Sequence, residues 1–304
     1  ARQHGGSAMA QNDRIDAFGA VALTGFAALL AVNQVVIAVV NEGLQPVFFA
    51  ALRSLGGVIC ILGWMRYRAI ALTVPPGTLV PGLLMGVLFA VEFICLFVAL
   101  DLTTVTRSAI IFYSMPVWLA LIGHLLIKGE RITGRKAMGL GLAFAGVVVA
   151  LVMRGGPDAE GSVIGDLCAL AAAMSWAGIA ALAKASRLRD VRPEMQLIWQ
   201  LAVSVPLLAL AAFAFGPFLR DPGWIHWAGL GFQILVIVSA GFLLWLWLLS
   251  IYPAASVAAF SFLSPVFGVL LGWLLLGERV GPGIAAALTL VVAGLILINR
   301  PASR

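Results

Sequence analysis

The stretch SPVFGVLLGWLLLGER at residues 264–279 repeats a pattern that occurs earlier in the chain as MPVWLALIGHLLIKGER, residues 115–131. Each copy has a proline near its start, continues as an apolar run and ends in Gly-Glu-Arg. Two later glycines, Gly146 and Gly294, keep the same spacing from these endings. The repeated unit is therefore about half of the chain and not a single helical hairpin.

The composition is that of a membrane protein. Hydrophobic residues make up 62% of the 304 residues and charged residues only 11%, whereas a soluble domain carries about 25% charged residues. A spanning helix needs roughly 20 apolar residues to cross a bilayer core of about 30 Å. The sequence contains ten such runs: 17–40, 46–65, 78–100, 107–127, 137–153, 163–183, 195–215, 226–249, 255–276 and 283–299.

The repeat divides these ten runs into two sets of five. Because five is odd, the second set enters the membrane from the opposite side. We therefore predict an all-α membrane protein with ten transmembrane helices in two inverted five-helix repeats. Its predicted parts are a cytoplasmic tail at 1–16, a first repeat at 17–154 and a second repeat at 163–300. Inverted repeats are typical of secondary transporters, in which one half moves against the other around a site at the middle of the membrane.

Basic residues lie mainly on one side of this predicted topology. If the first helix starts in the cytoplasm, 14 of the 19 lysines and arginines are cytoplasmic. Arg53 lies within a span, and four residues fall on the other side: Arg107, Arg154, Arg220 and Arg279. The positive-inside rule therefore places both termini in the cytoplasm. Topology also accounts for the net charge of +6, so the charge is no reason to expect a nucleic-acid partner.

Ten helices in two halves that each end in a Pro…Gly-Glu…Gly pattern resemble the drug/metabolite transporter superfamily, in particular its EamA-type exporters. The resemblance covers about residues 17–300 and includes the segment SWAGIAALAK at 175–184 and Arg53 in the second helix. It implies export of small metabolites, often amino acids, across a bacterial inner membrane, and the chain is most similar to the aromatic amino-acid exporters. The implied partners are a small-molecule substrate and the lipid bilayer; a monomer is sufficient, with a homo-oligomer as an alternative.

Arg53 and Glu92 are the charged residues predicted to lie well inside spans. Charges inside a bilayer are costly and are functional candidates by default. Counting residues from the same predicted surface places both about 10–12 Å deep, at 1.5 Å per residue. We therefore expect an ion pair with two hydrogen bonds, which lowers the cost of both charges. Three roles fit such a pair: structural pairing, binding of a zwitterionic substrate, and proton coupling through Glu92.

Pro116 and Pro265 interrupt corresponding helices of the two repeats. Each proline removes a backbone donor and leaves the carbonyl four residues earlier, at Phe112 or Ser261, without its helical partner. Paired breaks at membrane depth point to the binding site of a transporter, although a packing kink gives the same pattern. The side chains near the breaks that are predicted to contact substrate are those of Tyr113, Ser114, Ser261 and Ser264.

Trp118 and Trp176 are predicted near the middle of their helices, where a tryptophan has no membrane interface to anchor it. Each faces either the transport pathway or its lipid and protein neighbours. The family resemblance places the helix of Trp176 at the cavity, so Trp176 is predicted to contact substrate. Asn33, in the middle of the first helix, is a further candidate, with interhelical hydrogen bonding as the alternative role.

Other classes of protein receive little support from the sequence. The histidines, His4, His124 and His226, lack the HExxH spacing of a zinc hydrolase, and no Gly-rich phosphate loop is present. The cysteines fall in apolar runs without metal-ligand spacing. We therefore expect no enzyme activity, no cofactor and no metal. Two alternatives remain: an exporter of other small molecules or drugs within the same superfamily, and a passive channel, although channels usually form their pore by oligomeric symmetry rather than by repeats within one chain.

Overall fold

The computed structural model describes residues 16–126, 132–152, 161–251 and 263–299. Within these ranges the regular secondary structure is helical, apart from one isolated β-bridge between Leu44 and Leu219. The helices are α1 (Ala17–Gly43), α2 (Pro46–Tyr67), α3 (Leu79–Leu102), α4 (Val105–Phe112), α5 (Met115–Leu126), α6 (Gly134–Val152), α7 (Val163–Ala185), η1 (Arg187–Asp190), α8 (Pro193–Ala212), α9 (Trp224–Phe232), η2 (Gln233–Gly241), α10 (Phe242–Ile251), α12 (Leu263–Leu276) and α13 (Pro282–Asn299).

Eight stretches of the described residues are long and apolar enough to cross a membrane. One of them, Val105–Leu125, contains α4 and most of α5, and another, Trp224–Trp245, runs from α9 through η2 into α10. The helices α12 and α13 are apolar but shorter. The all-helical architecture is therefore confirmed for the described residues, whereas the count of ten spans stays a prediction.

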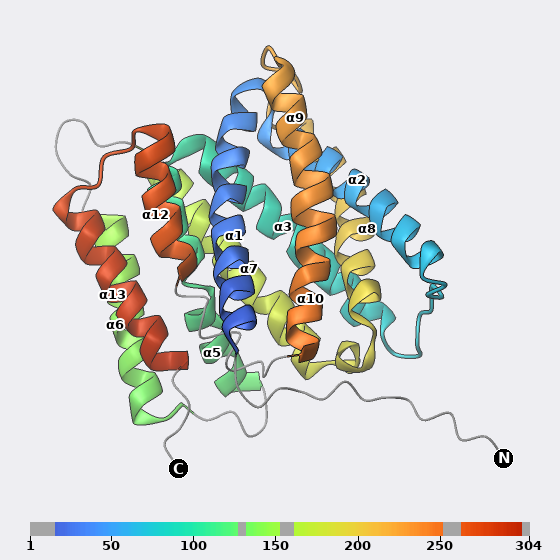
Figure 1. The fold of residues 1–304 in the computed structure, drawn as a ribbon, viewed down its shortest axis with the longest axis horizontal. Helices are drawn as coiled ribbons and strands as arrows, with labels where there is room; N and C mark the ends of the chain where they lie inside the picture. The colour runs from blue at the N-terminus through green and yellow to red at the C-terminus, as the bar shows by residue number, and fades with distance from the viewer. Residues whose placement is uncertain (1–15, 127–131, 153–160, 252–262, 300–304) are drawn as a thin grey trace.

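The helices lie side by side, and their ends define two faces of the bundle (Figure 1). The start of α1 and the end of α13 lie at one face, which we call the terminal end. The opposite face, the distal end, holds the turns between α1 and α2, between α3 and α4, and between α12 and α13. Backbone bonds tie the distal end together: Gln45 N–H donates to the Phe218 carbonyl at 3.0 Å, and Arg220 N–H donates to the Gly43 carbonyl at 2.8 Å.

The most extensive helix contact, between α6 and α13, depends on glycines. Gly146 of α6 and Gly294 of α13, which keep the spacing of the repeat, both lie in it. A Cβ atom added to Gly294 would lie 2.5 Å from the carbonyl oxygen of Gly139, and one added to Gly146 would lie 2.8 Å from that of Ala287. Backbone this close leaves no room for any side chain, so only glycine fits at these positions.

The other large helix contacts also join the two halves of the sequence. α3 packs on α7, α2 packs on α8, and α1 packs on α12. Each pair takes one helix from residues 17–152 and one from residues 163–299. The two sequence copies therefore interlock. Movement of one copy as a rigid body against the other, as the repeat by itself suggests, would break the largest packing contacts among the described helices.

The predicted span at 107–127 is divided into two helices. α4 begins at Val105 and ends at Phe112, and α5 begins at Met115. Pro116 is the second residue of α5, where its missing N–H is tolerated because the first turn of a helix has no acceptor for it. Pro265 is the third residue of α12, and Ser261 lies outside the described residues.

The predicted span at 226–249 contains a second irregularity. Between α9 and α10, residues Gln233–Gly241 form a π-helix, in which each hydrogen bond spans five residues instead of four. Ser239 Oγ donates to the Ile234 carbonyl within it at 2.7 Å. Stretches of this kind are frequent at functional sites, and Gln233 at the start of η2 is fully buried.

Candidate functional site

An aromatic cluster of Phe112, Tyr113 and Trp176 lies at the break between α4 and α5. The rings of Phe112 and Trp176 stack with their centroids 5.1 Å apart, and Tyr113 meets Trp176 edge-on at 6.4 Å. The Tyr113 hydroxyl donates to the Leu30 carbonyl of α1 at 2.9 Å. Tyr113 is buried, whereas Trp176 is only half-buried. The cluster therefore joins α1, α4 and α7 at the position where the helix is interrupted.

Ser114 and Trp118 use their polar groups on each other. The Trp118 indole N–H donates to Ser114 Oγ at 3.1 Å, and Ser114 Oγ donates to the Ile111 carbonyl at 2.6 Å. Trp118 also packs edge-on against Phe144 of α6. In this conformation neither residue has a polar hydrogen left for a substrate, because both donors are already used within the break. Ser264 is buried at the start of α12.

Asn33 makes the interhelical hydrogen bond that was the alternative to substrate binding. Its Oδ1 atom and its backbone carbonyl accept from Gln233 Nε2 at 2.7 and 3.2 Å. The next residue, Gln34, is fully buried, and neither of its amide atoms makes a hydrogen bond of ordinary geometry with a described residue. The Tyr113 hydroxyl is close enough to interact with it. Gln34 is therefore a better candidate than Asn33 for contact with a bound molecule.

Arg53 and Glu92 are both buried, with 1% and 4% of their surface exposed. The predicted pair with two hydrogen bonds is not formed between these two described side chains, and Arg53 Nε and Nη1 have no hydrogen-bond partner. Instead the guanidinium lies over the ring of Phe93, with Cζ 4.1 Å from the ring centroid. Glu92 and Phe93 are consecutive residues of α3, and consecutive side chains of a helix point about 100° apart. Glu92 therefore lies to the side of the guanidinium and not under it. The two charges still attract each other electrostatically.

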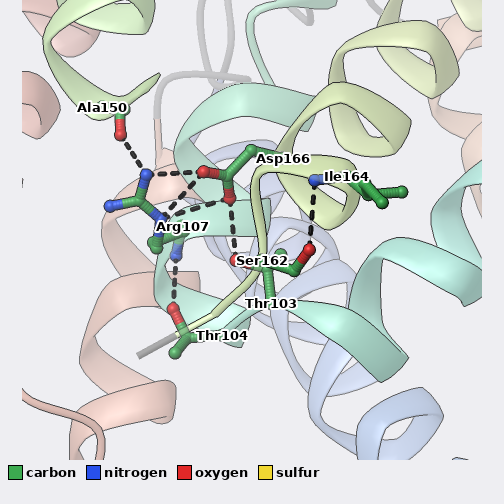
Figure 2. Close-up of polar contacts among 7 residues, drawn as sticks. All are labelled: Thr103, Thr104, Arg107, Ala150, Ser162, Ile164 and Asp166. Atoms are coloured by element: carbon green, nitrogen blue, oxygen red, sulfur yellow. Dashed lines mark hydrogen bonds and ion pairs between the residues drawn. The ribbon is translucent and has the colours of Figure 1, made fainter. Parts of the chain in front are cut away.

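A buried ion pair that the sequence did not predict lies at the distal ends of α4 and α7 (Figure 2). Arg107 Nη2 lies 2.6 Å from Asp166 Oδ2, and Arg107 Nε lies 3.1 and 3.2 Å from the two carboxylate oxygens. Arg107 Nη2 also donates to the Ala150 carbonyl near the end of α6, and Thr103 Oγ1 donates to Asp166 Oδ1 at 2.7 Å. Arg107 is 5% exposed and Asp166 is fully buried. The pair therefore joins α6 and the turn before α4 as well as its own two helices.

The helix boundaries explain why this pair was missed. Arg107 opens a predicted apolar run, so it was assigned to the outer surface, but Thr104 caps α4 earlier by accepting from the Arg107 N–H at 3.2 Å. Ser162 likewise caps α7 by accepting from the Ile164 N–H at 3.1 Å. Both charged residues thus lie in the first turn of a helix. The one signal in the sequence was Asp166, an acidic residue just inside an apolar run.

The second Gly-Glu-Arg turn caps the first turn of α4. Glu278 accepts from the N–H groups of Val105 and Thr106 at 2.6 and 2.7 Å. A carboxylate is favourable there because the first N–H groups of a helix lack partners and the helix dipole is positive at that end. Gly277 makes the turn possible with φ of 67°, which favours glycine. The corresponding turn at 129–131 lies outside the described residues.

Comparison with known proteins places this arrangement in a family. Residues 17–152 and 163–300 each match the model of the EamA-like transporter family. The chain belongs to the EamA-like transporter family. Two relatives from Bacillus subtilis (strain 168) are described as uncharacterized transporters. YoaV is 22% identical over 264 residues, 86% of this chain and 89% of YoaV; YvbV is 29% identical over 198 residues, 63% of this chain and 62% of YvbV.

A solved crystal structure shares the fold of this EamA-like transporter. It superposes with a TM-score of 0.65 at 22% sequence identity, covering 91% of this chain and 95% of the other. At this identity the likeness shows the fold alone. The family match and the apolar helices together show that the protein is a multi-pass membrane transporter.

The side chains gathered in this EamA-like transporter suit reversible binding. Within the described part of the chain, no group of three His, Cys, Asp or Glu side chains is placed to hold a metal ion. The aromatic cluster offers two stacked aromatic faces, with the buried amide of Gln34 close to Tyr113, and the buried guanidinium of Arg53 lies over Phe93 on α3. Such groups hold a small molecule by contact area, charge and hydrogen bonds, all of which can be released.

Proposed function

We propose that the protein is a secondary transporter that exports small metabolites, with aromatic or hydrophobic amino acids favoured, across a bacterial inner membrane by alternating access. The observation that carries the proposal is the aromatic cluster of Phe112, Tyr113 and Trp176 at a broken helix, with the buried amide of Gln34 close to Tyr113. Irregular backbone at membrane depth is tolerated where it lines a cavity or is buried in protein, and paired breaks mark transporter sites.

The aromatic cluster supplies the apolar side of the proposed site. A half-buried Trp176 stacked on Phe112 presents a flat surface to an aromatic or aliphatic side chain. Aromatic pairs contribute about 0.5–1.5 kcal/mol beyond the burial of their area, and a cation over such a face contributes about 0.5–2 kcal/mol. These contributions are small, as a carrier requires, because it must release on one side what it binds on the other.

Arg53 supplies the polar side of the proposed site. Arg53 and Tyr113 each lie seven or eight residues from the distal start of their helices, about 10–12 Å along the axis. Phe93, which lies under the guanidinium, belongs to the same contiguous apolar cluster as Phe112 and Tyr113. Arg53 Nε and Nη1 make no hydrogen bond and lie on opposite edges of the guanidinium, so either can donate a charge-assisted hydrogen bond to a carboxylate. We therefore propose that Arg53 binds the carboxylate of the substrate.

The proposed topology has ten spans in two inverted repeats, with both termini in the cytoplasm. On this topology the terminal end of the bundle faces the cytoplasm and the distal end faces outward. The excess of basic residues in the turns of the terminal end supports this orientation. The Arg53–Trp176 region then lies in the outer half and middle of the membrane.

Counterflow in proteoliposomes tests the proposed function. The purified chain is reconstituted into vesicles loaded with one unlabelled compound, and uptake of a labelled compound is followed for a panel of amino acids, nucleosides and cationic drugs. We expect saturable, transient accumulation of labelled phenylalanine, tyrosine or leucine driven by unlabelled amino acid inside. Saturable counterflow of nucleosides or drugs alone would contradict the proposed substrate class but would still show that the protein is a carrier. Non-saturable flux without counterflow would show a channel instead.

A further inference from the structure

We infer that Arg107 and Asp166 form a gate that closes the distal side of the transport pathway between α4 and α7. The inference rests on the proposed transport function but not on the identity of the substrate. It assigns a role in the transport cycle to two residues that lie outside the proposed binding site.

The gate and the aromatic cluster occupy the same two helices. Arg107 precedes Phe112 by five residues on α4, and Asp166 precedes Trp176 by ten residues on α7, which is about 15 Å along the helix axis. Phe112 and Trp176 stack on each other, as Arg107 and Asp166 pair with each other. A molecule leaving the cluster between α4 and α7 toward the distal end must therefore pass the ion pair.

The face of α7 between these two points is buried as well. Ala169 and Ala173 follow Asp166 at intervals of three and seven residues and precede Trp176 on the same helix face. Both alanines are fully buried. Because the side chains on this face are small, the neighbouring helices, and not bulky residues of α7, fill the space beside it. Separation of α4 from α7 would expose this face to the distal side.

Several bonds converge on α4 at the gate. The Arg107 guanidinium bonds to Asp166 of α7 and to the Ala150 carbonyl of α6, and Thr103 in the turn before α4 adds a bond to Asp166. Glu278 also accepts hydrogen bonds from the first N–H groups of α4. Helix α4 cannot move away from α7 at its distal end unless the ion pair breaks, because these bonds fix its first turn.

An ion pair suits a gate better than an apolar contact would. The attraction between two buried charges is largely offset by the cost of removing them from water, and that cost is recovered when an opening lets water in. A closed and an open state can therefore be close in free energy. The segment that matches this region in the second repeat, residues 249–260, contains no basic residue, so the sequence provides this lock only once.

Thiol labelling tests the gate. In full-length protein with Cys60, Cys95 and Cys168 replaced by Ser, Ala173→Cys places a reporter between the ion pair and Trp176. A membrane-impermeant maleimide is applied to the distal side in intact cells and, as a check of sidedness, to the terminal side in inverted vesicles. We expect slow labelling from the distal side when the gate is intact. Asp166→Asn should increase this rate several-fold, and Asp166→Glu, which keeps the charge, should restore a slow rate.

Two further variants keep the test decisive. Thr103→Val removes one bond to Asp166 and leaves the charges in place, so it should increase the rate by a smaller factor. Asp101→Asn breaks a different ion pair at the same end, with Arg220, and should leave the rate unchanged. The gate is overturned if folded Asp166→Asn and Thr103→Val both react at the parent rate, or, where Asp166→Asn does not fold, if Thr103→Val does. Labelling needs no substrate, so failure of the proposed substrate class leaves this result interpretable.

Discussion

Arg53 and Arg107 are both buried arginines in the first half of the chain, yet their surroundings differ. The Arg107 guanidinium contacts both oxygens of a carboxylate and a backbone carbonyl. The Arg53 guanidinium lies over the ring of Phe93, and two of its three nitrogens have no hydrogen-bond partner. A buried polar group without a partner is costly, which is why we propose that a substrate completes the surroundings of Arg53. Arg107 connects helices, and Arg53 is the arginine that we propose to bind substrate.

The largest effect on stability is expected at the paired arginine. Arg107→Ala leaves Asp166 buried without its counter-charge, and breaking a buried pair in this way costs about 3–5 kcal/mol. We expect a lower folded yield and a clearly lower melting temperature in detergent. The double variant Arg107→Ala with Asp166→Ala should recover part of the loss, because it strands no charge. If Arg107→Ala alone is as stable as the parent, Arg107 is not the more important of the two arginines for stability.

At Arg53 the expected effect is on transport rather than on folding. Arg53→Met removes a guanidinium whose Nε and Nη1 atoms make no hydrogen bond, so the folded yield should fall less than in Arg107→Ala, although Glu92 loses a nearby opposite charge. Loss of hydrogen bonds to a charged group costs about 1.5–3 kcal/mol, which raises the half-saturation concentration for amino acids about tenfold to hundredfold in counterflow.

Glu92→Gln is the matched control for Arg53→Met, because it changes the neighbouring charge and keeps the guanidinium. It should affect the half-saturation concentration less. If Arg53→Met misfolds and Glu92→Gln misfolds with it, the two residues form a structural pair. If Glu92→Gln folds but transport loses its pH dependence, the role of the region is proton coupling.

A smaller effect is expected at the apolar side of the same site. Trp176→Ala removes the ring that stacks on Phe112, and we expect a several-fold higher half-saturation concentration for aromatic substrates with little change for small ones. Trp176→Phe should retain most of the affinity. Trp118→Phe is the control, because Trp118 bonds to Ser114 and packs on α6 instead of joining the cluster. Equal changes in half-saturation concentration for the Trp176 and Trp118 variants would argue against Trp176 as the apolar side of the proposed site.

The smallest effect is expected at a third arginine. Arg220 pairs with Asp101 at the distal end, but the two side chains are 33% and 20% exposed. Ion pairs in contact with water contribute about 0–1 kcal/mol. Asp101→Asn should therefore shift the melting temperature only slightly, and addition of salt should remove most of the difference. A shift in melting temperature as large as that of Arg107→Ala would mean that the contribution of these ion pairs to stability does not depend on their burial.

The helix break at Pro116 could be predicted from the sequence because a proline acts on its own backbone. The absent N–H and the ring constrain the residues on either side, whatever the rest of the chain does. The position of Glu278 could not be predicted in this way. Its Gly-Glu-Arg turn was recognisable as a repeated landmark, but the helix that it caps lies more than 170 residues away in the sequence.

Composition and periodicity by themselves determined that this chain is an all-helical membrane protein, since the bilayer requires long apolar helices whatever their neighbours are. They also determined that Arg53 and Glu92 are buried, because both lie in the middle of apolar runs. Only the tertiary structure decided which groups meet. The packing of α3 against α7 and α8 sets the rotation of α3 about its axis, and with this rotation Phe93 rather than Glu92 lies under the Arg53 guanidinium. The adjacency of α4 and α7 brought Arg107 to Asp166, because contacts between helices depend on how whole faces pack and not on the residues next in sequence.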